Sequence, residues 1–286
     1  MEVVVQSFYD PSTSSVSHVV HSGAGSACAI IDPVLDFDIK SGRTATYQAD
    51  RILDYLRATK LGPAWILETH VHADHLTAAP YIKAQAGGRI AIGAGVTTVQ
   101  RTFGGIFNAD PTFRADGSQF DHLFADGEAF AVGELSGRVM ATPGHTPACV
   151  TYIIGDAAFV GDTLFMPDGG TARCDFPGGD ARLLYRSHRR ILDLPPQTRI
   201  FVCHDYQPGG RQPAWETTVA AQRAQNIHVH DGVDEDAFVA LRTARDATLS
   251  LPALLMPAVQ VNMRAGALPP AEANGVHYLK LPINLL

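Results

Sequence analysis

Four side chains able to bind a metal ion occur within six residues, directly after a run of apolar residues. Ala64 to Glu68 is predicted to form a buried strand, and the chain continues as Thr69-His70-Val71-His72-Ala73-Asp74-His75. A buried imidazole or carboxylate costs a few kcal/mol unless it has a partner, so core packing does not explain this group. Imidazole and carboxylate ligands together suit a borderline divalent cation such as Zn, Fe, Cu or Ni. The alternative is a polar turn whose histidines face water.

Three later motifs repeat this design. Each follows an apolar run: His145 lies in Thr142-Pro143-Gly144-His145-Thr146-Pro147, Asp162 in Gly161-Asp162-Thr163-Leu164-Phe165, and His204 in Cys203-His204-Asp205-Tyr206. The spacings of 75, 17 and 42 residues between His70, His145, Asp162 and His204 place each on a different strand end. Sites in layered α/β folds gather at the ends of strands, so we expect these four to converge on one edge.

The remaining pattern alternates strands and helices. The residues predict a first meander, three helices, a second meander and further helices, which favours an α+β fold of two sheets packed face to face with helices outside, a four-layer αββα sandwich. The expected strands of the first meander are Val3 to Phe8, His18 to Val20 and Ala27 to Ile31, and its helices are Thr46 to Ala58, Leu76 to Ala86 and Gly95 to Phe103. The expected second meander starts at His122, with later helices at Asp180 to Leu192, Pro213 to Gln225 and Asp234 to Thr248.

Length and charge limit the function classes. We expect residues 1–286 to form a single domain, with a core of about residues 3–206 and a C-terminal part, 207–286, whose helices and Pro-punctuated tail complete the cleft or form an interface. A net charge of −7 gives no basic footprint for nucleic acid. The apolar stretches are too short to span a bilayer and no signal core is present, so we expect a cytoplasmic protein without membrane contact. The four cysteines are expected to be free thiols.

The HxHxDH, GHT, GDTLF and CHDY motifs, in this order, resemble those of the metallo-β-lactamase superfamily. The resemblance implies an αββα sandwich with a metal cleft at one edge of the two sheets. It also implies the seven ligands of a dinuclear hydrolase: His70, His72, Asp74, His75, His145, His204 and, as the bridge, Asp162.

Further blocks are similar to the persulfide (sulfur) dioxygenase branch, which includes the human ethylmalonic-encephalopathy protein and bacterial β-lactamase-like hydrolases. They include Asp32-Pro33-Val34, Gly170 to Asp180 and Val261-Asn262-Met263-Arg264-Ala265-Gly266. This likeness implies one Fe(II) bound by His70, His145 and Asp162, with His72, Asp74, His75 and His204 lining the cleft or forming a second metal site. Glutathione persulfide and O₂ would be converted to sulfite and glutathione in sulfide detoxification.

The same likeness suggests substrate-handling residues. Tyr206 and His204 are the candidate catalytic residues, and Arg173, Arg264 and Tyr206 are the candidate substrate contacts. The alternatives are a surface salt bridge for Arg173, structural pairing for Arg264 and core packing for Tyr206. The sequence departs from the human type by a longer loop containing Pro167-Asp168 and by Ala265 in place of a cysteine.

Two other functions remain open at this point. One is a dizinc thioester hydrolase of the glyoxalase II type acting on hydroxyacylglutathione, with two Zn in place of one Fe(II). The other is a regulatory or scaffold member of the fold without catalysis. The family resemblance also implies a homo-oligomer, either a dimer or a tetramer.

Overall fold

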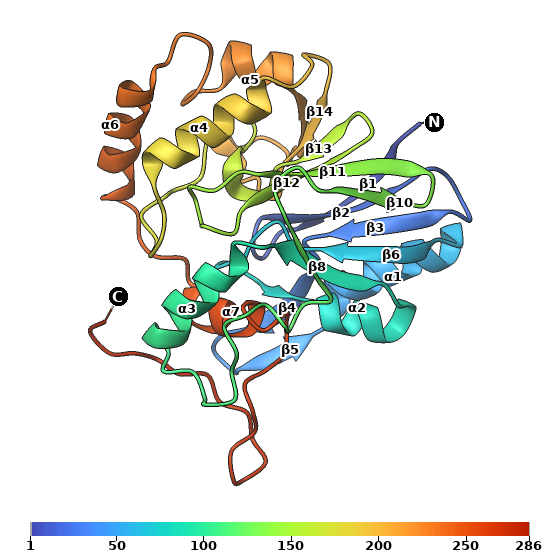
Figure 1. Ribbon diagram of the computed structural model, residues 1–286, viewed down its shortest axis with the longest axis vertical. Helices are drawn as coiled ribbons and strands as arrows, with labels where there is room; N and C mark the ends of the chain where they lie inside the picture. Colours follow the sequence, from blue (N-terminus) through green and yellow to red (C-terminus); the bar gives the residue numbers. More distant parts are fainter. Residues whose placement is uncertain (1, 286) are drawn as a thin grey trace.

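Two six-stranded sheets organise the computed structural model, which describes residues 2–285 (Figure 1). The first sheet has the order β1-β2-β3-β6-β8-β9, with β1 (Val4–Asp10), β2 (Ser15–His21), β3 (Ala27–Ile31), β6 (Gly62–Leu67), β8 (Arg89–Gly93) and β9 (His122–Phe124). The second has the order β10 to β15, with β10 (Ala129–Val132), β11 (Leu135–Ala141), β12 (Val150–Ile154), β13 (Ala157–Phe159), β14 (Arg199–Phe201) and β15 (Glu216–Thr218). A small third sheet joins β5 (Arg43–Ala45), β4 (Val34–Asp38) and β7 (Leu76–Thr77).

The two large sheets pack face to face through apolar side chains. Val20 and Leu67 of the first sheet share one buried cluster with Tyr152 and Phe201 of the second. Strands whose inner faces are apolar must bury those faces against another layer, and the two sheets bury theirs against each other.

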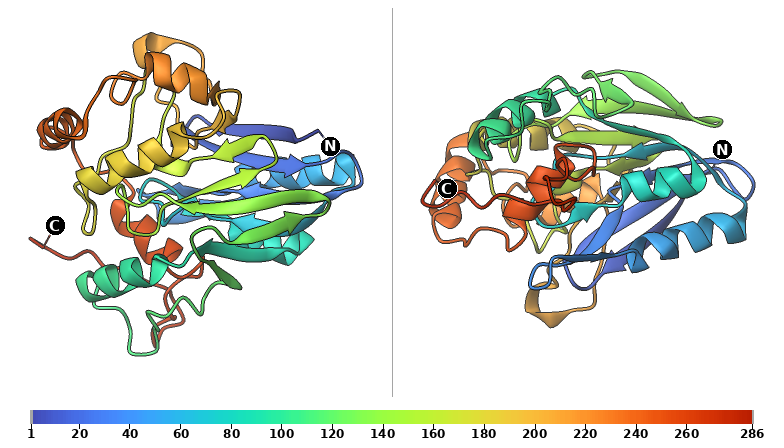
Figure 2. Two further views of the ribbon diagram at one scale, coloured as in Figure 1. Left: turned by 45° about the horizontal axis from the view of Figure 1, so that its top comes forward. Right: turned by 90° about the horizontal axis from the view of Figure 1, so that it is seen from below.

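Helices cover the outer faces of both sheets (Figure 2). The described helices are α1 (Tyr47–Thr59), α2 (Ala79–Ala86), α3 (Val96–Ile106), α4 (Ala181–Leu192), α5 (Val219–Gln225), α6 (Glu235–Asp246) and α7 (Leu255–Asn262). Ile52 of α1 and Ile82 of α2 pack in one core cluster with Ile66 of the first sheet. Leu184 of α4 packs in another with Ile200 of the second sheet. The predicted four-layer αββα arrangement is therefore confirmed.

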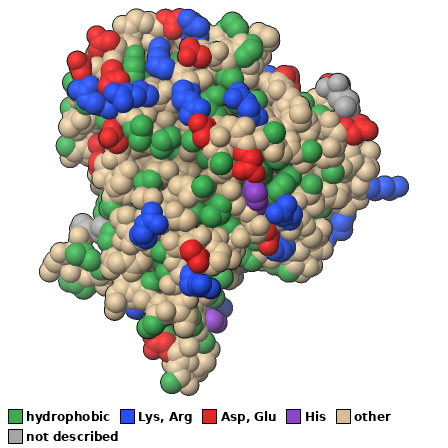
Figure 3. Space-filling view, in the orientation of Figure 1, with side chains coloured by type: hydrophobic (Ala, Val, Ile, Leu, Met, Phe, Trp, Pro, Cys, Tyr) green, Lys and Arg blue, Asp and Glu red, His purple; other side chains and the backbone are tan. Residues whose placement is uncertain are grey.

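Helices α4 and α6 are also joined by charge. Arg182 and Arg186 on α4 contact Glu235 at the start of α6, at 3.0 and 3.2 Å, and Arg182 contacts Asp236 at 2.8 Å. In the space-filling view, basic and acidic side chains lie side by side over this part of the molecule (Figure 3). These exposed pairs flank the apolar contact of α6 with α4, in which Phe238 and Leu184 share one buried cluster.

Several predicted elements were wrong in place or type. Strand β9 was expected in the second meander, but it pairs in parallel with β8 and so closes the first sheet. The helix expected from Pro213 begins only at Val219, because residues Glu216–Thr218 pair with β14. The helix expected from Leu76 begins at Ala79, because Leu76–Thr77 pairs with β4. In each case pairing with a distant strand overrides the local pattern.

Other elements were not predicted at all. They are β4, β5, β8 and the helix α7, which lies inside the Pro-punctuated tail. The short strands carry little periodic signal, and α7 carries Pro257 in its first turn, a position that proline tolerates. In the described part of the chain, no helix combines the length and apolar character that a bilayer crossing requires.

Candidate metal centre

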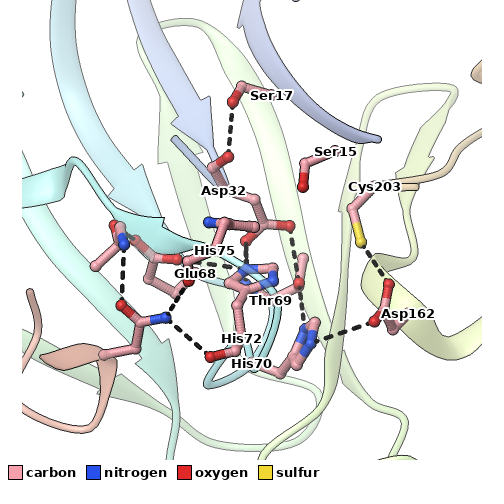
Figure 4. Close-up of polar contacts among 12 residues, drawn as sticks. Ser15, Ser17, Asp32, Glu68, Thr69, His70, His72, His75, Asp162 and Cys203 are labelled. Carbon is pink, nitrogen blue, oxygen red and sulfur yellow. Dashed lines mark hydrogen bonds and ion pairs between the residues drawn. The ribbon is translucent and has the colours of Figure 1, made fainter. Parts of the chain in front are cut away.

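The four predicted strand-end residues meet at one edge of the sandwich. His70 follows β6, His145 follows β11, Asp162 lies in the short turn η1 (Gly161–Thr163) after β13, and His204 follows β14. His70, His145 and Asp162 form one group whose ligand atoms lie within 4.8 Å of one another. His72, Asp74, His75 and His204 form a second such group. The expected convergence is confirmed, and Figure 4 shows part of it.

Two glycines let the turns approach closely. Gly144 has φ +138°, and a Cβ there would lie 2.3 Å from the backbone of Leu184 on α4. Gly161 has φ +53°, and its Cβ would lie 2.5 Å from Oγ1 of Thr69. Both conformations favour glycine. The turns that carry His145 and Asp162 are therefore seated directly against neighbouring elements.

In the first group, two imidazoles face one carboxylate oxygen. Nε2 of His145 lies 3.5 Å and Nε2 of His70 lies 3.7 Å from Oδ2 of Asp162. Two donors each about 2.1 Å from a shared ion would be separated by roughly 3.0 to 3.5 Å at ordinary coordination angles. All three residues are buried, and among the described residues 2–285 Nε2 of His70 has no hydrogen-bond partner. An orphaned imidazole nitrogen facing a carboxylate is what a divalent metal ion would satisfy, so these residues fit a metal.

Outer hydrogen bonds orient both imidazoles. Nδ1 of His145 donates to the carbonyl of Arg173 at 2.6 Å. The hydroxyl of Thr69 donates to Oδ2 of Asp32 at 2.8 Å, so its oxygen accepts from Nδ1 of His70 at 3.0 Å. With the protons on Nδ1, each Nε2 keeps its lone pair for a metal. Burial lowers the pKa of His70 well below its usual value, and the charge of the neighbouring His72 lowers it further. The His70 ring is therefore neutral.

The second group is held by closer contacts among its own members. Nε2 of His204 lies 3.0 Å from Oδ2 of Asp74 and 3.7 Å from Oδ1 of Asp162. Burial lowers the pKa of His75 to about 4. Burial would also lower the pKa of His204, but the Asp74 and Asp162 carboxylates raise it to about 9. These side chains could ligate a second ion or pair with one another.

His72 occupies a different environment from the other histidines. Its Nε2 lies 2.9 Å from Oδ1 of Asp32 and 3.6 Å from Oε2 of Glu68. Burial would lower the pKa of His72, yet these carboxylates raise it to about 10. Burial raises the pKa of Glu68 to about 8. In the metal-free protein, His72 is thus protonated and in contact with Asp32, and a metal ion at its Nε2 would have to displace that proton.

Two residues that support the site were not predicted as such. Asp32 accepts hydrogen bonds from the backbone N–H of Thr69 at 2.7 Å and from its hydroxyl. Asn262, at the end of α7, donates to the backbone carbonyls of His72 at 2.9 Å and His75 at 2.7 Å, and accepts from the N–H of Thr77 at 2.9 Å. Both belong to sequence blocks named above. Their positions in the sequence did not predict that they contact residues 69–75, the ligand loop that carries the HxHxDH motif.

A cavity of about 540 Å³ is lined by His145 and Asp162 of the first group and also by Tyr206, Arg173 and Arg245. The Tyr206 ring is 59% exposed and stacks on His204, with ring centroids 5.5 Å apart. The tyrosine hydroxyl is protonated at neutral pH, so it can donate a hydrogen bond into the cavity.

The guanidinium of Arg173 is already occupied. It contacts both carboxylate oxygens of Asp175, at 2.6 and 2.7 Å, and donates to the carbonyl of Ser250 at 2.6 Å. Arg242 is buried and paired with Asp246 at 2.6 Å. Arg245 is exposed, and its side chain has no hydrogen-bond or ion-pair partner within residues 2–285. Of the three arginines lining the cavity, Arg245 is therefore the one free to meet an anion.

The expected placement of Arg264 in the substrate cleft was wrong. Its guanidinium lies 2.8 Å from Asp110 and stands over the ring of Phe113, and it lines a separate cavity formed with the C-terminal tail. The short helix α7 places Asn262 toward the ligand loop and Arg264 away from it.

Relatives of this chain carry several names. It is 56% identical to a probable metallo-hydrolase of Burkholderia pseudomallei, covering 99% of this chain and 100% of that protein. It is 53% identical to glyoxylase B2 of Dictyostelium discoideum, covering 91% and 89%. It is 27% identical to the human mitochondrial persulfide dioxygenase ETHE1, covering 94% and 91%.

Solved structures and family models agree on the fold. The crystal structure of ETHE1 from Myxococcus xanthus superposes with a TM-score of 0.73 at 26% identity, covering 92% of this chain and 100% of that one. Residues 11–204, which contain every residue of both ligand groups, match the model of the metallo-beta-lactamase superfamily. With the αββα sandwich and its ligand-bearing edge, this match shows that the chain belongs to the metallo-beta-lactamase superfamily.

Proposed function

We propose that this protein is a non-haem Fe(II) persulfide dioxygenase that oxidises glutathione persulfide with O₂ to sulfite and glutathione. The observation that carries the proposal is the group of His70, His145 and Asp162, in which both Nε2 atoms face one carboxylate oxygen. Two histidines and one carboxylate with open coordination positions are typical of non-haem Fe(II) oxygenases. Nε2 of His72, from the same motif as His70, contacts Asp32 instead. The relationship to the persulfide dioxygenase ETHE1 supports the same reaction.

The reaction balances with one persulfide, one O₂ and one water. The terminal sulfur loses four electrons to O₂ and leaves as sulfite, while the remaining sulfur leaves as the thiol of glutathione. Iron(II) held by His70, His145 and Asp162 would supply the redox chemistry that activates O₂.

The chain's own residues place the substrate. The cavity joins the ligand group to Tyr206 and Arg245, so the persulfide end would lie over the ligands with the peptide toward the rim. Tyr206 would donate a hydrogen bond near the reacting sulfur. Arg173 would act indirectly, because its carbonyl orients His145 and its guanidinium ties Asp175 to the 249–250 segment. As part of the proposal, the protein works in cytoplasmic sulfide detoxification as a dimer or tetramer.

The second candidate is a dizinc hydroxyacylglutathione thioester hydrolase of the glyoxalase II type. It is favoured by the second ligand group of His72, Asp74, His75 and His204, and by the Dictyostelium relative named glyoxylase B2. In the metal-free protein, Nε2 of His72 contacts the Asp32 carboxylate, so a second ion there would compete with this contact.

Elemental analysis of anaerobically purified protein, combined with two assays, separates the candidates. One iron per chain with O₂ uptake on glutathione persulfide is the expected result. Two zinc ions per chain, with hydrolysis of lactoylglutathione and no O₂ uptake, would contradict the dioxygenase assignment and support the hydrolase.

A further inference from the structure

The two oxygens of the Asp162 carboxylate face different ligand groups. Oδ2 lies 3.5 Å from Nε2 of His145 and 3.7 Å from Nε2 of His70. Oδ1 lies 3.7 Å from Nε2 of His204, which in turn lies 3.0 Å from Asp74. Nδ1 of His204 is buried and has no hydrogen-bond partner among residues 2–285. The carboxylate therefore stands between two groups, and Oδ1 is the atom that a second ion would need.

A thiol lies directly against this second oxygen. Sγ of Cys203 is 2.8 Å from Oδ1 of Asp162, and Figure 4 shows the contact. The Cys203 side chain is 2% exposed, and its backbone is held to β2 because the Cys203 carbonyl accepts a hydrogen bond from the N–H of Val16 at 2.7 Å. A carboxylate oxygen only accepts, so the S–H group is the donor.

We propose that Cys203 is a positioning residue that keeps the centre mononuclear. Its thiol donates to Oδ1 of Asp162, which weakens that oxygen as a ligand for a second ion beside Asp74, His75 and His204. The same hydrogen bond turns Oδ2 toward His70 and His145, where the single ion is held. The inference rests on the proposed function, because it takes the group of His70, His145 and Asp162 as the resident site.

Substitutions at position 203 distinguish the effect of the hydrogen-bond donor from the effect of side-chain volume. Serine keeps a donor at position 203, whereas valine keeps the approximate volume without a donor and alanine removes both. Hydrogen bonds to charged groups are strong enough to change an equilibrium by about tenfold to a hundredfold. We expect the affinity for a second ion to rise by that factor when the donor is lost.

The test is an anaerobic titration of metal-free protein with Fe²⁺ and separately with Zn²⁺, with bound metal counted by elemental analysis after gel filtration. Wild type and Cys203→Ser are expected to hold one ion tightly. Cys203→Val and Cys203→Ala are expected to take up a second ion with tenfold to hundredfold higher affinity than wild type. Cys28→Ala is the matched control, because Cys28 is a fully buried thiol in the core cluster under α1.

Three results would overturn the proposal. They are two tightly bound ions in the wild type, a Cys203→Val protein that still holds only one ion, or a thiolate-to-metal absorption band on loading wild type with Co²⁺, which would make Cys203 a ligand. Circular dichroism identifies a variant that does not fold, and the valine and alanine variants serve as alternatives to each other. The metal count does not depend on turnover. A mononuclear protein without O₂ uptake would therefore contradict the dioxygenase proposal and leave this inference standing.

Discussion

Nε2 of His72 lies 2.9 Å from Oδ1 of Asp32, and both side chains are at most 2% exposed. Asp32 stands at the end of β3, next to β6, whose continuation carries the ligand loop. The second histidine of the HxHxDH motif thus anchors this loop to the first sheet through a buried ion pair. That contact leaves His70 as the member of the motif that faces His145 and Asp162.

Replacing Asp32 by asparagine should destabilise the fold. The variant keeps an acceptor for the N–H of Thr69 but leaves the His72 imidazolium without its counter-charge. Breaking a buried ion pair costs roughly 3 to 5 kcal/mol, so we expect a loss of about that size in the free energy of unfolding, measured by urea denaturation of the metal-free protein. Asp54→Asn is the control, because the Asp54–Arg57 pair is exposed and should contribute little. A loss no larger than that of the control would contradict the anchoring role.

The stabilisation from this pair should depend on pH in the metal-free protein. The pKa of Asp32 is lowered from 3.8 to about 2, so its contribution is present above pH 3.8 and is lost as the pH falls toward 2. The pKa of His72 is raised from 6.5 to about 10, so its contribution is present below pH 6.5 and is lost as the pH rises toward 10. The difference in unfolding free energy between wild type and Asp32→Asn should therefore be largest between pH 3.8 and 6.5. A difference that grew toward pH 10 would disprove the assignment.

Substitutions in the two ligand groups should have unequal effects on bound iron. His70→Ala, His145→Ala and Asp162→Asn each remove a group that faces the shared position, so each should lose the iron and the O₂ uptake. His75→Ala should retain the iron. His122→Ala is the control for loss of a histidine, because the His122 ring contacts Glu128, Trp65 and Phe124 and belongs to neither ligand group. Iron retained by His70→Ala, or lost by His75→Ala, would move the resident site to the second group.

Asn262 should raise the affinity of the site for its metal ion indirectly, because it contacts the backbone of the ligand loop and no ligand atom of the first group. Asn262→Leu removes the hydrogen bonds to the carbonyls of His72 and His75 and to the N–H of Thr77. Outer contacts of this kind typically change metal affinity by about 10- to 100-fold, and we expect a loss in that range by chelator competition. Gln260→Leu on the same helix is the matched control, because that amide contacts Met256 and Lys280 instead. Equal effects of both substitutions would reduce Asn262 to a general role in packing α7.

The free guanidinium at the cavity should bind the carboxylates of the substrate. Arg245→Ala is expected to raise the KM for glutathione persulfide roughly tenfold with little change in kcat, the effect of losing one exposed charged contact. Arg264→Ala should leave KM unchanged, because Arg264 pairs with Asp110 in a separate cavity. Steady-state O₂ uptake measures both values, and a larger rise in KM for Arg264→Ala than for Arg245→Ala would return Arg264 to the substrate cleft.

The convergence of the candidate ligands was predictable from sequence because each motif is local. His70, His145, Asp162 and His204 each follow an apolar strand, and strand ends on one side of packed sheets must share an edge. The same holds for α1, α4 and α6, whose apolar residues recur at helical spacing and whose positions match the prediction closely. Short stretches of sequence therefore determine which ligand types the cleft contains.

Tertiary structure decided which of these groups are free to act. Three contacts join residues that lie 40 to 190 positions apart in the sequence. They are His72 with Asp32, Cys203 with Asp162, and Asn262 with the carbonyl of His72 in the ligand loop. The guanidinium groups of Arg173 and Arg264 form ion pairs with Asp175 and Asp110, whereas that of Arg245 has no such partner within residues 2–285. The sequence shows which side chains can bind a metal ion or a substrate. Whether a given charge or hydrogen-bond donor is available depends on the groups that the fold places beside it, because a neighbouring partner pairs with it. Only the packed chain shows those neighbours.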